Sequence, residues 1–155
     1  SFGMAFLCVI IHVPVLGDEY EACFKEAGEF YNVNPLLLRA IAIQESSLQV
    51  DAFNSNGKKS FDLGIMQINS SHYQKLEDEF SLSLSHIKEP CQNIILGAWI
   101  LADCIRMFGN NWNAVGCYNA GNSKSKKQQE RRKYYATKVS HIYNRLERLR
   151  SRGLH

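Results

Sequence analysis

Four cysteines constrain this chain more than any other feature, because each pair that they form holds two distant segments together. They form an even set: Cys23, Cys91, Cys104 and Cys117. No Cys-x-x-Cys pair indicates a metal site. Four cysteines permit three pairings, of which we favour Cys23–Cys91 with Cys104–Cys117. The first bridge would close a long loop and stabilise the domain by about 4 kcal/mol in the chain-entropy model. The alternative is four buried thiols.

The stretch that precedes these cysteines is apolar from Met4 to Leu16. It is too short for a membrane-spanning helix, which needs about 20 apolar residues. We expect residues 1–17 to be the remnant of a secretory signal peptide, with Cys8 inside it and the small Gly17 at its end. The alternative is a buried N-terminal helix or strand. Export agrees with an even set of cysteines, because disulfides persist in oxidising compartments.

The remaining chain has the composition of one compact domain, which we place at residues 18–150, followed by a tail at residues 151–155. The 155 residues are 45% hydrophobic and 21% charged. Their charge is uneven, since residues 1–123 carry a net −6 and residues 124–155 a net +9. Such a basic end suits an anionic polymer, an acidic protein surface or a solvated helix face. We expect no nucleic-acid partner, because the tyrosines in this region lie on an apolar stripe instead of in an exposed groove.

Helix signals recur along the whole domain. Asp18 followed by Glu21 predicts one helix start, and Asn34-Pro35 predicts another, for a helix that runs to about Ser47. Between the helices, Asn56-Gly57 indicates a hairpin turn. Three more helices are predicted: 91–108 with a left-handed Gly109 at its end, a short one between Asn111 and Gly121, and 125–149. The predicted class is α+β, mainly α, with a small β-hairpin insert.

Glu45 lies on the apolar face of the second predicted helix. It follows Leu38, Ile41 and Ala42 at offsets of seven, four and three residues. Burial on that face would raise the pKa of its carboxyl group, and the dipole of the helix end would raise it further. A carboxyl group that is still protonated near neutral pH can act as a general acid on a leaving-group oxygen. The alternative is a frayed, solvated helix end.

Asp62 lies beyond the hairpin turn, in a more polar stretch that should keep it ionised. Two carboxyl groups whose environments separate their pKa values are the working parts of glycosidic-bond cleavage. The alternative is a turn aspartate that accepts hydrogen bonds from nearby backbone N–H groups, just before Gly64.

Three ordered motifs, "IQESS", "DLGIMQIN" and "AVGCYNAGN", resemble those of the specialised lytic transglycosylases encoded with type III and type IV secretion systems. These are relatives of the soluble lytic transglycosylases and share the lysozyme-like fold. The resemblance covers residues 18–148. It implies a periplasmic enzyme that cuts peptidoglycan between N-acetylmuramic acid and N-acetylglucosamine. It also implies that the enzyme opens the wall locally for a secretion system, with glycan strands and a secretion-system component as partners.

The resemblance also implies roles for single residues. Glu45 would be the catalytic acid, and would then act as base on the C6 hydroxyl of the muramoyl residue, which closes to a 1,6-anhydro product without water. Tyr135 matches the late tyrosine that orients this glutamate, with its neighbour Tyr134 as the alternative. The residues assigned to substrate binding are Ser46, Met66, Gln67, Asn69, Tyr118 and Asn119.

Other candidates are weaker. Trp99 and Trp112 each fall on an apolar helical face, so they are more typical of core residues than of sugar-stacking residues. The histidines show no ligand spacing, so we expect neither a metal nor a cofactor. We expect a monomer without stable membrane insertion.

Asp62 departs from the wider transglycosylase pattern, in which most enzymes have no carboxylate near this position. The segment "DLGIMQINS" resembles the corresponding part of chicken-type lysozyme, where an aspartate serves as nucleophile or stabiliser. Asp62 could therefore support the transition state while the C6 hydroxyl attacks, or it could permit hydrolysis by water. A rival from another class is a noncatalytic assembly factor that holds the apparatus to the wall through its basic C-terminal helix.

Overall fold

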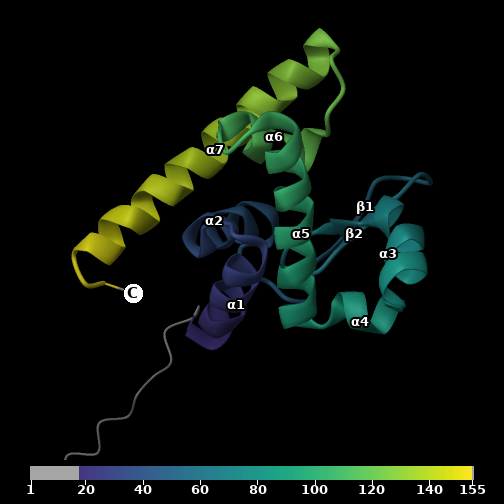
Figure 1. Cartoon of the computed structure of the whole chain (residues 1–155), viewed down its shortest axis with the longest axis horizontal. Helices are drawn as coiled ribbons and strands as arrows, with labels where there is room; N and C mark the ends of the chain where they lie inside the picture. The colour runs from purple at the N-terminus through teal and green to yellow at the C-terminus, as the bar shows by residue number, and fades with distance from the viewer. Residues whose placement is uncertain (1–17, 155) are drawn as a thin grey trace, which may run out of the picture.

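The computed structural model describes residues 18–154, so the expectation of a signal remnant at residues 1–17 lies outside the described residues (Figure 1). Within this range the chain forms seven α-helices, two short 3-10 helices and three strands. In chain order they are η1 (Asp18–Tyr20), α1 (Glu21–Tyr31), α2 (Pro35–Ser46), β1 (Phe53–Ser55), β2 (Phe61–Leu63), β3 (Ile68–Asn69), η2 (Ser70–His72), α3 (Tyr73–Phe80), α4 (Leu84–Lys88), α5 (Pro90–Phe108), α6 (Trp112–Ala120) and α7 (Lys126–Ser151). The predicted class, mainly α with a small β element, is confirmed.

The predicted start of α2 is confirmed. The Asn34 side chain accepts a hydrogen bond from the backbone N–H of Leu36, and Pro35 occupies the first helical position. The predicted cap at Asp18 is wrong by two residues, because Asp18–Tyr20 form a 3-10 turn and α1 begins at Glu21, with Tyr20 at the cap position and no side-chain cap. Sequence signals locate a helix better than they locate its first residue.

The three later predicted helices are confirmed as α5, α6 and α7, with different end geometry in one case, whereas α3 and α4 were not predicted. The side chains of Asn111 and Ser125 cap α6 and α7 by accepting from backbone N–H groups. Gly109 ends α5 with φ 84° and ψ 171°, which is a positive-φ conformation but not the predicted left-handed helical one.

The small sheet is antiparallel, in the order β1-β2-β3. Asp62 in the central strand pairs with Asn54 on one side and Asn69 on the other. The hairpin connection is longer than the predicted Asn-Gly turn, because it closes with a hydrogen bond from the Asn56 N–H to the Ser60 carbonyl oxygen at 2.8 Å. The third strand was not predicted, since two residues are too few for an alternating pattern to show.

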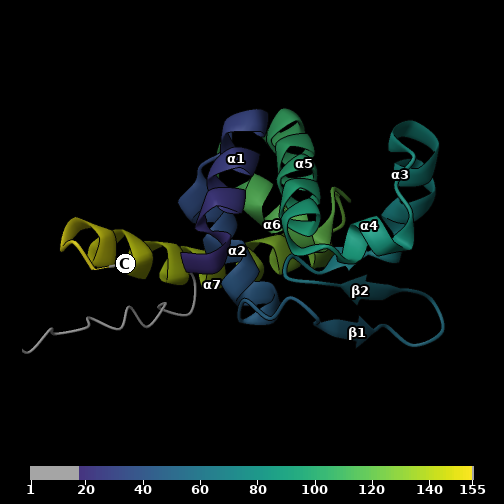
Figure 2. The same cartoon turned by 90° about the horizontal axis from the view of Figure 1, so that it is seen from below.

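Helix α5 is the centre of the helical body. It packs against α1, α6 and α4, while α7 crosses α6 and α2 on another side (Figures 1 and 2). Helix α5 is long and apolar enough to span a membrane by length and composition alone, with a mean hydropathy of 1.3. In this fold its apolar face belongs to the core instead, with Ile94, Ala98 and Leu101 fully buried.

Both predicted disulfides are present, and both are anchored on α5. Cys23–Cys91 joins α1 to the start of α5 with a Cα–Cα distance of 5.3 Å. Cys104–Cys117 joins the last part of α5 to α6 with a Cα–Cα distance of 5.8 Å. These distances are ordinary for a disulfide. The two bridges therefore hold α1 and α6 to opposite ends of one helix.

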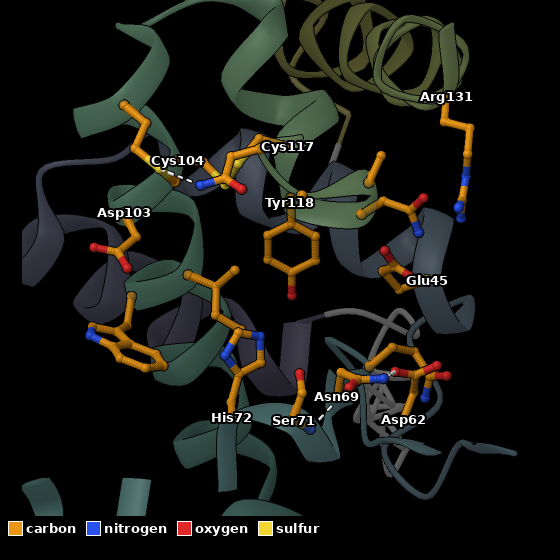
Figure 3. A pocket seen from close by; sticks show the side chains of 18 of the residues that line it. Glu45, Asp62, Asn69, Ser71, His72, Asp103, Cys104, Cys117, Tyr118 and Arg131 are labelled. Atoms are coloured by element: carbon orange, nitrogen blue, oxygen red, sulfur yellow. Dashed lines mark hydrogen bonds between the residues drawn. A yellow bond between two sulfur atoms is a disulfide. The ribbon is translucent and has the colours of Figure 1, made fainter. Parts of the chain in front are cut away.

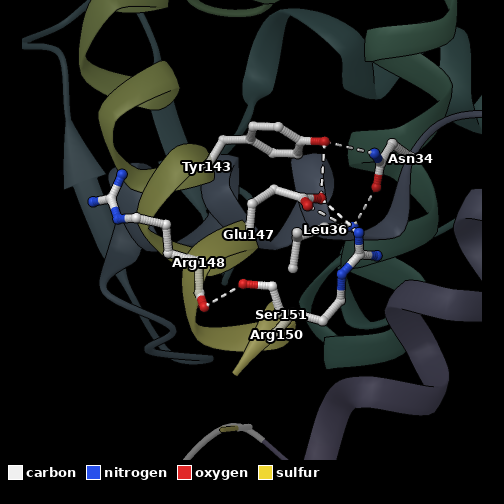
Figure 4. A network of polar contacts seen from close by, with 7 residues as sticks. All are labelled: Asn34, Leu36, Tyr143, Glu147, Arg148, Arg150 and Ser151. Atoms are coloured by element: carbon white, nitrogen blue, oxygen red, sulfur yellow. Dashed lines mark hydrogen bonds and ion pairs between the residues drawn. The ribbon is translucent and has the colours of Figure 1, made fainter. Parts of the chain in front are cut away.

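Helix α7 is held at two places along its length. Near its start, the backbones of α6 and α7 approach so closely that a Cβ on Gly116 would lie 2.4 Å from the carbonyl oxygen of Arg132. Further along, Asn34 donates to the Tyr143 hydroxyl, which donates to Glu147, each at 3.1 Å (Figure 4). These contacts fix the side of α7 that carries Tyr135 against the helix that carries Glu45.

Candidate active site

A cleft of about 610 Å³ is lined by residues of α2, the sheet, α5, α6 and α7 (Figure 3). The structure brings together in this cleft six residues that the sequence singled out: Glu45, Asp62, Gln67, Asn69, Tyr118 and Asn119. Among residues 18–154, no group of three His, Cys, Asp or Glu side chains is arranged to hold a metal ion.

Glu45 lies in the last turn of α2 and points into the cleft. Its Oε1 atom accepts a hydrogen bond from the Tyr135 hydroxyl at 2.6 Å. Burial raises the pKa of this carboxyl group from 4.5 to about 7, and the negative charge of Asp62 also raises it. The hydrogen bond from Tyr135 and the positive charge of Lys138 act in the opposite direction and lower the pKa. Near neutral pH the group therefore exists in both protonation states, as a residue that acts as acid and then as base requires.

Tyr135, and not Tyr134, is the tyrosine that faces the glutamate. Tyr135 is 4% exposed, whereas Tyr134 is 68% exposed. Burial and the nearby charge of Glu45 raise the pKa of the Tyr135 hydroxyl well above its usual value of 10.0. The hydroxyl therefore stays protonated and remains a hydrogen-bond donor, which fixes the orientation of the carboxyl group.

Asp62 is held by side-chain amides on both of its oxygen atoms. Asn69 donates to Oδ1 at 2.8 Å, and Asn56 donates to Oδ2 at 2.9 Å. The hydrogen bonds of Asp62 thus come from neighbouring side chains and not from the backbone of a turn. Asn56 was missed as a site residue, because its position before Gly57 indicated only a hairpin. It lies outside β1, and the residue of β1 that pairs with Asp62 is Asn54, so local spacing gave no signal for this contact.

The segment between Gly64 and Gln67 forms a tight loop below the cleft. Gly64 and Gln67 both have positive φ, of 80° and 52°, and such a conformation is costly for a residue with a side chain. The Gln67 side chain compensates by donating from Nε2 to the carbonyl oxygens of Ala52 and Gly64 and by accepting from Asn54. Gln67 lines the cleft, but both ends of its amide group already have protein partners.

The prediction that Met66 contacts the sugar is wrong. Its side chain is fully buried, where it packs so closely on Gly97 that an added Cβ there would lie 2.5 Å from its terminal methyl. Its backbone is held from two helices, because its N–H donates to Asn93 Oδ1 at 2.8 Å and its carbonyl accepts from the Tyr118 hydroxyl at 2.7 Å. The motif residue therefore anchors the loop to the core.

The hydroxyl of Ser46, which was predicted to bind substrate, is engaged by the protein itself. It donates to the carbonyl oxygens of Ala42 and Ile65, at 3.1 and 2.7 Å, and the residue does not line the cleft. The contact joins the end of α2 to the loop that precedes β3. Ser46 thus helps to place Glu45 relative to Gln67.

The two tryptophans differ from each other and from the predicted core positions. Trp99 is half-buried and lines the cleft, where its ring makes edge contacts with His72 and Phe80. Trp112 is 42% exposed and lines a separate pocket beside Tyr143. Helical periodicity could not reveal either outcome, because a helix face that lines a cleft has the same apolar pattern as one that lines the core.

The fold and the cleft define a lysozyme-like protein that cleaves glycosidic bonds, since one carboxyl group is buried and protonatable and a second is held by polar partners. Comparison with known families agrees. The chain belongs to the transglycosylase SLT domain family, whose model matches residues 22–140, and it is a peptidoglycan lytic transglycosylase.

Its relatives include proteins of enteric bacteria. It is 37% identical over 142 residues to Invasion protein IagB of Salmonella typhimurium, covering 92% of this chain and 88% of that protein. It is 38% identical over 148 residues to Protein IpgF of Shigella flexneri, covering 96% of this chain and 91% of that protein. The fold is similar to that of an inactive mutant of the lytic transglycosylase Slt from Pseudomonas aeruginosa, with a TM-score of 0.63 and 22% identity. That match covers 83% of this chain and 24% of the larger protein.

Proposed function

We propose that the cleft cleaves the β-1,4 bond between N-acetylmuramic acid and N-acetylglucosamine and leaves a 1,6-anhydromuramoyl end. Protonated Glu45 donates its proton to the glycosidic oxygen as the bond from that oxygen to C1 breaks. The resulting Glu45 carboxylate then accepts the proton of the C6 hydroxyl, whose oxygen forms the new bond to C1. Glu45 is thereby protonated again, and no water is consumed.

The observation that carries this proposal is the pKa of Glu45. A carboxyl group with a pKa of about 7 loses and regains a proton readily near neutral pH. The Tyr135 hydroxyl donates to one oxygen of this carboxyl group, so the proton that Glu45 donates is available on the other oxygen. One residue can therefore serve both steps.

In this mechanism Asp62 acts through its charge. Its two amide partners hold both oxygens in place, and a fixed negative charge stabilises the positive charge that develops on the sugar ring in the transition state. The same fixed geometry supports a second candidate function, hydrolysis of the same bond by a lysozyme-type muramidase. In that reaction Asp62 would assist attack by water, and the product would have a reducing end.

Product analysis separates these two functions. Peptidoglycan digested by the wild-type protein and analysed by mass spectrometry is expected to show 1,6-anhydromuramoyl ends; reducing ends alone would refute the transglycosylase mechanism. Glu45→Gln is expected to lower turnover by about 10²–10⁴-fold, the usual contribution of proton transfer. Asp62→Asn should cost clearly less, whereas a lysozyme would lose a comparable amount in both variants.

We also propose that the enzyme acts in the periplasm, where it opens the wall for a secretion system. Three observations support this setting: peptidoglycan lies outside the cytoplasm, two disulfides suit an oxidising compartment, and a relative bears the name Invasion protein. Expression in an enteric host followed by osmotic shock is expected to release the oxidised protein. Protein that stays in the cytoplasm with free thiols would contradict the proposal. A strain carrying Glu45→Gln should lose secretion, whereas a noncatalytic assembly factor would keep it.

A further inference from the structure

One face of α7 forms a basic edge along the cleft. Arg131, Tyr135 and Lys138 recur at offsets of four and seven residues, so they lie on the same side of the helix. Tyr135 faces Glu45 from this side. Arg131 lines the cleft one turn earlier, and Figure 3 shows its side chain reaching from α7 toward the side of the cleft where Glu45 lies.

The guanidinium group of Arg131 has no carboxylate partner within the part of the chain that the structure describes. Four basic residues in the described range do have one, for example Lys75 with Glu79 and Arg106 with Asp103. Among the basic residues of this range without a partner, Arg131 is the one that lines the cleft. Arg131 is exposed and makes no side-chain hydrogen bond to another residue in the range 18–154. Its five N–H donors are therefore available to a ligand in the cleft.

Lys138 adds to the positive charge of this edge but acts on a different group. Its ammonium group lies 4.6 Å from the centroid of the Tyr134 ring, and its charge lowers the pKa of Glu45. Lys138 thus influences the catalytic carboxyl group directly. Arg131 can be changed with less effect on Glu45, so it is the better probe of what the edge binds.

We propose that Arg131 binds a carboxylate of the stem peptide on the muramoyl residue, so that the cleft prefers glycan strands that carry peptides. This inference rests on the proposed function. The sugars of an intact strand are uncharged, and the negative charges of the substrate lie on the peptides attached through the lactyl group. A guanidinium group matches a carboxylate with two parallel hydrogen bonds, which makes arginine better suited than lysine to this contact.

The test compares binding to two forms of one substrate. Soluble peptidoglycan strands are used either untreated or after carbodiimide and ammonia have converted their stem carboxylates to carboxamides. Binding is measured in the Glu45→Gln background, which removes turnover, by titration calorimetry at low salt. Arg131→Gln is expected to weaken binding to untreated strands about fivefold, as for an exposed charged contact, and to leave binding to amidated strands unchanged.

Two further variants sharpen the comparison. Lys133→Gln removes a positive charge from an exposed position of the same helix that lines another pocket, so it should have little effect on either substrate. Arg131→Lys keeps the charge and should retain part of the affinity. Because the contact is exposed, the difference between the two substrates should also shrink as salt is added.

The outcomes separate this inference from the proposed function. Equal loss on untreated and amidated strands, or no loss on either, overturns the role of Arg131. Selective loss on untreated strands together with a wild-type protein that cleaves neither substrate would support the peptide contact and refute the proposed function. A Glu45→Gln protein that binds no strands at all would overturn both.

Discussion

The buried carboxyl group of Glu45 should make the protein less stable as the pH rises, and Glu45→Gln should remove this effect. The pKa of this group is 4.5 when it is exposed, as in the unfolded chain, and about 7 in the folded protein. Between these two values the folded state binds the proton and the unfolded state does not. Raising the pH through this window therefore favours unfolding.

The size of the effect follows from the two pKa values. A difference of one pKa unit corresponds to about 1.4 kcal/mol. The free energy of unfolding of the wild type should therefore fall by about 3 kcal/mol between the two pKa values. Gln has nearly the same shape, can still accept from Tyr135 and carries no charge. We expect the variant to match the wild type at about pH 4.5 and to be more stable by about 3 kcal/mol at about pH 8. The corresponding difference in melting temperature is about 6–12 °C for a chain of this size.

Urea unfolding of the oxidised protein, followed by circular dichroism at a series of pH values, measures this difference. A matched control is Glu77→Gln, which makes the same change at an exposed glutamate on α3 and leaves the buried carboxyl group of Glu45 in place. The reasoning is refuted if the difference between Glu45→Gln and wild type is constant with pH, or if the wild type gains stability relative to the variant as the pH rises.

Three further predictions test the surroundings of Glu45. Tyr135→Phe removes a hydrogen bond that lowers the pKa of Glu45. The pH at which kcat/KM falls on the alkaline side should therefore rise by about 1–2 units. An unchanged or lower pH for this fall would contradict the role of Tyr135. Gly116→Ala should lower the urea unfolding free energy by about 1–3 kcal/mol, since its Cβ would overlap the backbone of Arg132, and unchanged stability would contradict so close a contact. Asn93→Ala leaves three buried backbone groups without a partner and should cost about 3 kcal/mol or more in the same assay, whereas a loss below 1 kcal/mol would contradict this account.

The sequence placed Glu45 and Tyr135 on inward faces because each lies in a regular helix, and the family resemblance suggested their roles. Periodicity placed Glu45 on the face of Ile41, and it placed Tyr135 on the inward stripe of α7 while Tyr134 points outward. The choice between the two tyrosines needed only the 3.6-residue repeat. Their separation of 90 residues and their contact at 2.6 Å required the tertiary structure.

The loop residues were predicted less well, for a physical reason. Positive φ at Gly64 and Gln67 breaks the regular alternation of side chains, so a motif that contains Met66 does not tell which of its side chains faces the cleft. The side chain of Met66 lies in the core, whereas that of Gln67 lines the cleft. Asn56 acquired its partner Asp62 only when the two strands paired, which no local pattern could show.

The two disulfides divide the chain into parts that differ in how they respond to a protease. The bridge between Cys23 and Cys91 encloses both carboxylates and the whole sheet, and the bridge from Cys104 ends at Cys117. A cut in the exposed hairpin loop at residues 56–60 thus leaves two fragments that remain covalently linked. A cut at residues 121–125 leaves α7 without a covalent link to the rest, because neither bridge reaches past Cys117, so only its packing against α6 and α2 retains it. The oxidised enzyme should therefore survive nicking of its hairpin, whereas after one cut before α7 the contact of Tyr135 with Glu45 depends on non-covalent packing alone.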